Sequence, residues 1–105
     1  MPLNSILVEG STLSVVSFSP ATSFSPDRAS FSLNCGPDVP AIPILTEGPL
    51  ACRCRPLAPG TRLRLVGRLH HDAEATARTG RFTLVVLAEH LELAPVPASH
   101  RTEVA

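Results

Sequence analysis

Two short stretches with a two-residue period constrain the fold of this chain more than any other feature. In residues 28–35 (RASFSLNC) apolar and polar side chains alternate cleanly. In residues 61–69 (TRLRLVGRL) the same period predicts that Leu63, Leu65, Gly67 and Leu69 face inward and that Arg62, Arg64, Val66 and Arg68 face outward. That period is typical of a β-strand with one buried face. The 105 residues, with 11 prolines and 6 glycines, suit one domain and argue against a long helical bundle. We therefore expect a single all-β domain.

Three further apolar stretches are predicted to be strands. They are residues 3–16, 39–45 and 81–93. Gly10 lies inside the first stretch and predicts a bend, which would let one long strand serve two sides of a barrel. The second stretch contains Pro40 and Pro43, which cannot donate to a strand ladder. We expect that strand to be an edge strand or poorly paired.

Residues 47–60 are predicted to form one or two helical turns. Pro49 suits the first turn, and Pro56 must end the helix early. The apolar face of this helix is expected to consist of Leu50, Cys54 and Leu57.

Five short strands with a helix between the third and fourth follow the order of the OB-fold, a five-stranded Greek-key barrel. Its ligand face is built from strands 2 and 3 and from the loops that join strands 1–2 and 4–5. We predict those loops at residues 17–27 and 70–80. The domain is expected to span residues 1–94, and residues 95–105 are expected to be a frayed tail.

The formal net charge of zero hides a segregated distribution. Residues 51–81 carry a net charge of +5, whereas residues 1–50 carry −3 and residues 82–105 carry −2. All nine basic residues are arginines. A localised basic surface is typical of a site for anions or nucleic acid. The alternative is a solvated surface on which the arginines pair with nearby carboxylates.

Aromatic side chains are scarce, because the chain has four phenylalanines and no tryptophan or tyrosine. Phe18 and Phe24 lie in the polar stretch 17–27. Each is expected either to cover the core or to be exposed and stack on a nucleobase. Phe31 and Phe82 are predicted to belong to the core.

Several stretches carry a resemblance to a known family, in the same order and spacing. They are residues 4–10 (NSILVEG), 29–33 (ASFSL), 57–69 (LAPGTRLRLVGRL) and 80–93 (GRFTLVVLAEHLEL). Over roughly residues 3–93 the chain resembles bacterial single-stranded DNA-binding proteins. The resemblance implies an OB-fold, a homo-oligomer that is usually a tetramer, and sequence-independent wrapping of single strands in replication, recombination and repair.

The sequence also departs from that family. Its members stack bases on tryptophans in the second and third strands and at the start of the strand 4–5 loop, and this chain has none. Here that loop begins with His70 and His71. The family's acidic C-terminal tip, which recruits partner enzymes, is not expected here, because the printed sequence ends HRTEVA. A shorter relative, the primosomal replication-restart subunit, shares these traits and acts as a dimeric OB-fold adaptor.

The predicted nucleic-acid site uses arginines for phosphate contact and smaller rings for stacking. It comprises Arg62, Arg64, Arg68, Arg78, Arg81, Phe18, Phe24, His70 and His71. The alternative for the arginines of residues 61–69 is an oligomer interface or a solvated face. The expected function is sequence-independent binding of single-stranded DNA. The alternative function is an OB-fold assembly subunit that binds protein partners and little or no DNA.

Other chemistry has little support in the sequence. Cys52 and Cys54 form a C-x-C pair that Cys35, His70 and His71 could complete as zinc ligands, but no second pair has finger-like spacing. We expect the two cysteines of the pair to be small buried residues on a short helix. No cofactor or enzymatic activity is predicted. Without a secretory signal or a long apolar run, a cytoplasmic, nucleoid-associated protein with reduced thiols is expected.

Overall fold

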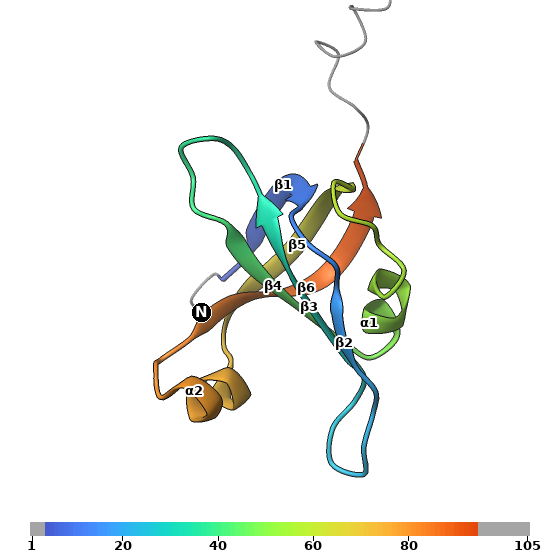
Figure 1. Cartoon of the computed structure of the whole chain (residues 1–105), viewed down its shortest axis with the longest axis vertical. Helices are drawn as coiled ribbons and strands as arrows, with labels where there is room; N and C mark the ends of the chain where they lie inside the picture. The colour runs from blue at the N-terminus through green and yellow to red at the C-terminus, as the bar shows by residue number, and fades with distance from the viewer. Residues whose placement is uncertain (1–3, 95–105) are drawn as a thin grey trace, which may run out of the picture.

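The computed structural model describes residues 4–94, which form a closed β-barrel (Figure 1). In chain order the elements are β1 (Ile6–Thr12), β2 (Ser17–Ser19), β3 (Arg28–Asn34), β4 (Ile42–Glu47), α1 (Pro49–Cys54), β5 (Arg62–His71), α2 (Ala73–Thr79) and β6 (Leu84–Leu93). The sheet order is β1-β5-β6-β4-β3-β2, and a further pairing of β1 with β3 closes the barrel. Only β4 and β6 run parallel among these pairs. The predicted five-stranded OB-fold is confirmed, with β2 as a short addition beside β3.

A bend in β1 closes the barrel, as the glycine in this strand predicted. β1 pairs with β5 from Ile6 to Ser11, and then with β3 at Ser11 and Thr12. A Cβ atom on Gly10 would lie 2.5 Å from the carbonyl oxygen of Asn34. The close approach of β3 therefore requires glycine at this position.

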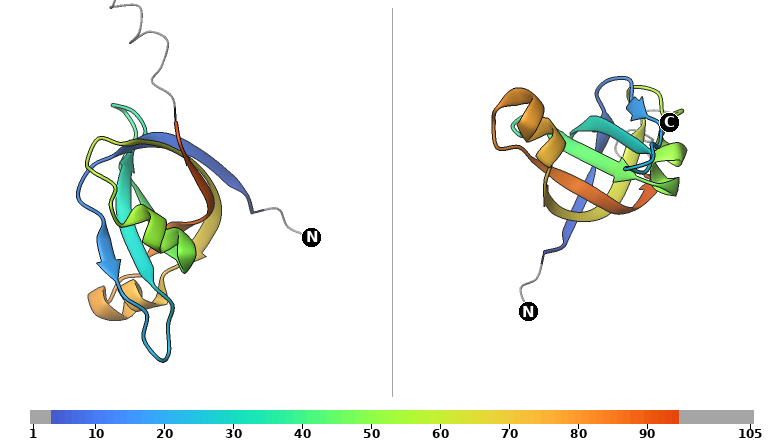
Figure 2. Two further views of the ribbon diagram at one scale, coloured as in Figure 1. Left: turned by 90° about the vertical axis from the view of Figure 1, so that its right-hand side faces the viewer. Right: turned by 90° about the horizontal axis from the view of Figure 1, so that it is seen from below.

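The core lies inside the barrel and is made of the inward residues of the alternating strands. Leu33, Leu63 and Leu65 have no exposed surface, and Ile44 is nearly as buried. Helix α1 covers one mouth of the barrel (Figure 2, left) and contributes Ala51 and Cys54 to the core. Leu50 packs against the core half-buried, which confirms Leu50 and Cys54 as the apolar face of the helix. Leu57 also packs there, but it lies after the end of α1.

Two predicted loops contain regular structure instead. Residues 17–19 form β2, which extends the sheet beside β3, so the loop itself is confined to residues 20–27. Strand β5 continues to His71, and the predicted polar loop 70–80 is largely helix α2. Asp72 caps this helix by accepting a hydrogen bond from the Ala75 N–H at 3.1 Å. Gly80 ends it in the left-handed conformation, with φ of 74°.

The third predicted strand is shifted and is not an edge strand. It spans Ile42–Glu47 instead of residues 39–45 and has β3 on one side and β6 on the other. The alternative expectation of poor pairing is confirmed on the β6 side, where the ladder is limited to Ile44 and Leu45. The backbone nitrogen of Pro43, which carries no hydrogen, lies outside that short ladder.

Three residues predicted to be buried are exposed. Leu69 is 51% exposed, because the β5–β6 ribbon runs on beyond the barrel after a register shift at Val66/Gly67. Phe82 is 71% exposed, since it follows α2 outside the barrel, and Cys52 lies on the outer side of α1. Phe31 is buried as predicted. The predicted tail, residues 95–105, lies outside the described residues.

The described residues contain no helix with the length and apolar character needed to cross a membrane.

Candidate nucleic-acid interface

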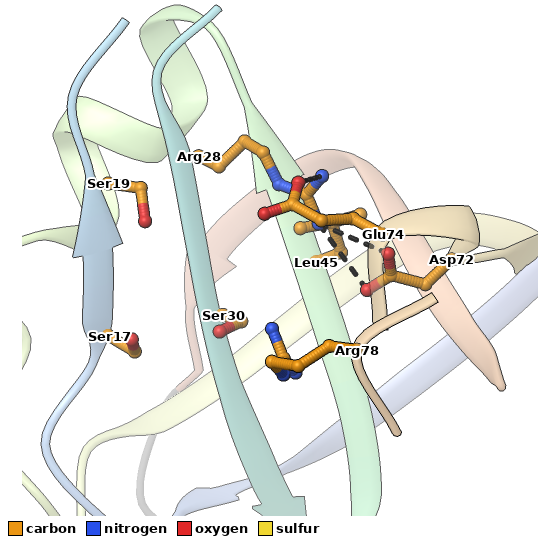
Figure 3. Close-up of a pocket in the computed structure, with 8 residues that line it drawn as sticks. All are labelled: Ser17, Ser19, Arg28, Ser30, Leu45, Asp72, Glu74 and Arg78. Carbon is orange, nitrogen blue, oxygen red and sulfur yellow. Dashed lines mark hydrogen bonds and ion pairs between the residues drawn. The ribbon is translucent and has the colours of Figure 1, made fainter. Parts of the chain in front are cut away.

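A polar groove runs over the outer faces of β3 and β4, between β2 and α2. Its deeper part, a pocket of about 240 Å³, is lined by Ser17, Ser19, Arg28, Ser30, Leu45, Asp72, Glu74 and Arg78 (Figure 3). An adjoining pocket of equal volume shares Ser17, Ser30, Leu45 and Asp72 and continues past Ser14 and Ser32. We call the two pockets together the β3–β4 groove. It lies on the face and between the loop regions that an OB-fold uses for ligands.

Alternation along β3 explains why the groove is polar. Ala29, Phe31 and Leu33 point into the core, so Arg28, Ser30 and Ser32 face outward. β2 pairs with β3 so that Ser17 lies opposite Ser30, which adds a second hydroxyl at the same level. Serine hydroxyls donate hydrogen bonds to anionic oxygens. The groove offers such donors, and the one aromatic residue along it, Phe31, is buried.

Two projecting segments flank the groove. The loop 20–27 and helix α2 extend from the same end of the barrel in both Figure 1 and the left view of Figure 2. The base of α2 is held by Thr76, whose hydroxyl accepts from the Thr83 N–H at 3.0 Å and lies 2.9 Å from His71 Nε2. The helix is therefore fixed as a wall of the groove.

An ion-pair cluster ties this wall to β3. The guanidinium of Arg28 contacts Asp72 at 3.3 Å and Glu74 at 2.5 Å. Burial of Asp72 disfavours its charge, but hydrogen bonds from the Ala75 N–H and Arg28, with the positive charge of Arg28, outweigh that effect and lower the pKa of this carboxyl. We call Arg28, Asp72 and Glu74 the Arg28 clamp.

The pKa of Asp72 makes the stability of this region depend on pH. A carboxyl whose pKa is lowered by folding stabilises the fold above its unfolded pKa of about 3.9, and that contribution is lost as the pH falls through the folded pKa. Asp72→Asn keeps a capping oxygen but cannot titrate. We expect D72N to flatten the fall in unfolding free energy below about pH 4. Urea unfolding from pH 7 to pH 2 measures this, with D38N on an exposed turn as control; equal pH profiles for D72N and the wild type would contradict it.

Arg78 is the basic residue of the groove whose guanidinium is available to bind an anion. Its side chain reaches from α2 over the groove toward Ser30 (Figure 3). Arg28 is engaged by two carboxylates, whereas Arg78 forms no ion pair with any residue between 4 and 94. Of the nine residues predicted for the site, Arg78 is the one that lines the pocket.

Arg62 and Arg64 lie on another face of the barrel, formed by β1, β5 and β6. Glu9 on β1 contacts Arg62 at 3.1 Å and Arg64 at 2.8 Å, and Glu92 on β6 lies 3.5 Å from Arg64. Hydrogen bonds from Arg64 and Arg62, with their positive charges, lower the pKa of Glu9. Two arginines and two glutamates thus form a neutral network, as in the solvated alternative considered from the sequence.

The other predicted residues lie outside the groove and do not gather at one place. Arg68 and Arg81 are exposed and form no ion pair within the described part of the chain. Phe18 packs half-buried against the core with the Arg55 guanidinium 4.6 Å from its ring centre. The remaining three are Phe24 in the loop 20–27, which is 98% exposed, His70, which is half-buried, and His71, whose ring stacks on Phe82.

The cysteines and histidines do not assemble into a metal site in the described residues, where no three potential ligands gather. The Cys52 thiol faces outward and donates a hydrogen bond to Asp27 at 3.1 Å, whereas Cys54 is buried in the core. The two members of the C-x-C pair therefore point in different directions.

The serines and the carboxylates of the groove are not among the site residues predicted from the sequence. The outward position of Ser30 and Ser32 was visible in the alternation of β3. The contact of Arg28 with Asp72 and Glu74 joins residues more than forty positions apart. No local sequence pattern predicts a contact between residues so far apart.

Comparisons with known proteins give a match in structure only. No protein-family model matches the sequence, and no curated protein matches it. The single-stranded DNA binding protein of Thermus aquaticus aligns over 90% of this chain with a TM-score of 0.74 and 20% identity. The chain spans 42% of that protein's length.

Two smaller structures align over nearly their whole length. The N-terminal domain of PriB from Thermoanaerobacter tencongensis, described as dimeric, has a TM-score of 0.68 and 19% identity over 89% of this chain and 98% of its own. The SSB domain of a Synechococcus protein has a TM-score of 0.69 and 12% identity over 88% and 97%. The chain therefore has the OB-fold found in single-stranded DNA-binding and PriB proteins.

Proposed function

We propose that this chain is a non-enzymatic protein that binds single-stranded DNA without reading its sequence, at strands exposed in the nucleoid during replication, recombination or repair. The observation that carries the proposal is the available guanidinium of Arg78 above a row of serine hydroxyls on the ligand face of an OB-fold. The fold shared with single-stranded DNA-binding proteins supports it.

The chemistry of the groove favours contact with the phosphate backbone. Guanidinium and hydroxyl groups both donate to phosphate oxygens, and such contacts carry no sequence information. The exposed rings within the described residues, Phe24, His71, Phe82 and His90, lie outside the groove. Affinity that depends on phosphate contact falls steeply with salt, because each neutralised phosphate releases counterions.

The salt dependence of binding tests the proposal directly. We expect labelled oligo-dT to bind at low salt, with log K falling as log [salt] rises. Arg78→Ala should make that slope shallower by about 0.7, the value for one phosphate contact on a single strand. The matched change Arg64→Ala should leave the slope unchanged, because the carboxylates of Glu9 and Glu92 already neutralise that arginine. Fluorescence anisotropy measures both slopes.

The same titration separates the proposal from the alternative function. An absence of binding at tens of micromolar protein and low salt would overturn DNA binding and favour an assembly subunit with protein partners. A slope that changes with Arg64→Ala and not with Arg78→Ala would move the site to the β1-β5-β6 face.

We also propose that the protein is a homodimer joined through β1. Among the described strands only β5 pairs with β1 over residues 6–10, so the other edge of this segment is open. Leu7, on the same segment, is 70% exposed. Open strand edges pair readily with another chain, and a two-fold axis pairs β1 with its own copy. The PriB domain of the same fold is described as dimeric, which supports a dimer.

A charge at the open edge should abolish the dimer. Leu7→Asp places a carboxylate where two copies of β1 would meet, and we expect a dimeric mass to become monomeric. Light scattering after gel filtration measures the mass, with Leu93→Asp as the control at an equally exposed leucine. A monomeric wild-type protein would contradict the proposal.

A further inference from the structure

The ring of Phe82 lies on the surface beside α2 and stacks on a second ring. The ring centres of Phe82 and His71 are 4.4 Å apart, and their planes differ by 12°. Phe82 is nevertheless 71% exposed, so one side of the pair remains open to solvent. The stacking holds the Phe82 ring in one orientation and leaves its π-face available for a further ring to stack on.

The chain holds this ring pair in place. The imidazole of His71 lies 2.9 Å from the hydroxyl of Thr76, which also accepts from the N–H of Thr83. A third bond runs from the N–H of Asp72 to the carbonyl of Thr83 at 2.9 Å. The residues next to both rings are thus joined across the base of α2, so a ligand would meet a preorganised flat surface.

An arginine without an ion pair is the chain neighbour of the exposed ring. Arg81 directly precedes Phe82, is exposed, and forms no ion pair within residues 4–94. The nearby carboxylates of Asp72 and Glu74 are both paired with Arg28. An open ring face next to such an arginine matches a nucleobase and its phosphate, since every base has a flat π-face. An apolar partner surface would bury the charge of Arg81 without compensation.

The ring pair lies next to the β3–β4 groove but on the opposite side of the β5–β6 ribbon. Val85 lines the groove, and its neighbour Leu84 pairs with His71. Neighbouring residues of a strand point to opposite faces, so His71 points away from the groove floor. Asp72, the next residue along the chain, lines the groove itself. A single strand that leaves the groove over this edge meets the ring pair directly.

We propose that the open face of Phe82, backed by His71 and flanked by Arg81, is a base-stacking site for single-stranded DNA leaving the groove. The site rests on the proposed function, and it supplies the stacking that the groove lacks. Phe82 is the residue in direct contact with the base, and His71 positions its ring.

A single tryptophan reports on this contact. The protein contains no tryptophan or tyrosine, so Phe82→Trp introduces the only indole and its emission comes from this site alone. We expect oligo-dT to quench that emission, because a stacked base quenches indole fluorescence. Leu93→Trp, at another exposed position, should keep its emission when the same oligonucleotide binds.

Two substitutions distinguish the effect of the aromatic π-face of Phe82 from that of its apolar volume. Phe82→Leu keeps an apolar side chain and loses the π-face, and Phe82→Ala loses both. We expect each to weaken oligo-dT binding by about 5- to 100-fold, the range for one stacked base. Because Phe82 is exposed, both variants should keep the far-ultraviolet circular dichroism and melting temperature of the wild type.

The outcomes distinguish this site from the proposed function. Oligo-dT binding with an unquenched tryptophan at position 82 and full affinity of Phe82→Leu would overturn the stacking site and leave groove binding intact. A failure of all variants and the wild type to bind would overturn both. Loss of self-association in Phe82→Ala, with unchanged DNA affinity, would assign the surface to a second copy of the chain.

Discussion

Leu33→Ala is expected to lower the free energy of unfolding by about 3–5 kcal/mol, the range for a leucine removed from a packed core. Leu33 has no exposed surface and lies on β3 where this strand pairs with both β1 and β4. The cavity would open at the point where the barrel closes, and its strand neighbours cannot move inward without breaking ladder hydrogen bonds.

This loss is large relative to the total stability of a domain of this size, which is about 5–15 kcal/mol. Urea unfolding followed by far-ultraviolet circular dichroism measures it. Leu93→Ala makes the same chemical change at a side chain that is 69% exposed. We expect the control to cost less than about 0.5 kcal/mol. Equal losses for the two variants would contradict the placement of Leu33 in the core.

Reversing the charge of Arg78 is expected to weaken oligo-dT binding by about 10- to 100-fold at low salt. The change removes a charged hydrogen bond worth about 1.5–3 kcal/mol, and each 1.4 kcal/mol is a factor of ten in affinity. Arg78→Glu also adds a third carboxylate to a groove that already holds Asp72 and Glu74. That third carboxylate repels the phosphate as well.

Removal of a negative charge from the Arg28 clamp should strengthen oligo-dT binding. Glu74 is 65% exposed and contacts Arg28 at 2.5 Å, so Glu74→Gln frees part of that guanidinium for phosphate and removes a repulsive charge. We expect a gain of about 2- to 10-fold, in line with the small energies of exposed ion pairs.

A third variant tests whether a change in the net charge of the protein, made outside the groove, weakens binding by itself. Arg53→Glu makes the same reversal on α1, at an exposed arginine that forms no ion pair within the described residues. Anisotropy titrations of the three variants at one salt concentration give the comparison. If Arg53→Glu weakens binding as much as Arg78→Glu, long-range charge and not the groove determines affinity.

Much of the fold could be predicted from local patterns. The alternation in residues 28–35 and 61–69 placed two strands and their buried faces, and Gly10 placed the bend. The pattern failed where the chain leaves the barrel. Leu69 and Phe82 are apolar, and apolar residues are usually buried, but the β5–β6 ribbon carries them past the core into solvent.

The site was harder to predict, because its geometry comes from distant parts of the chain. Spacing alone put Arg62 and Arg64 on one face of a strand, and it could not show Glu9 and Glu92 on the neighbouring strands. Arg78 was predicted on charge alone. Its place above the serines depends on α2, which was expected to be a loop.

The bend at Gly10 also determines how the domain comes apart. Because the same short segment of β1 belongs to the ladder with β5 and to the ladder with β3, neither half of the barrel can separate while the other stays closed. Ser11 takes part in both ladders. The barrel is thus expected to unfold as one cooperative unit, with no partly open state in which the groove persists.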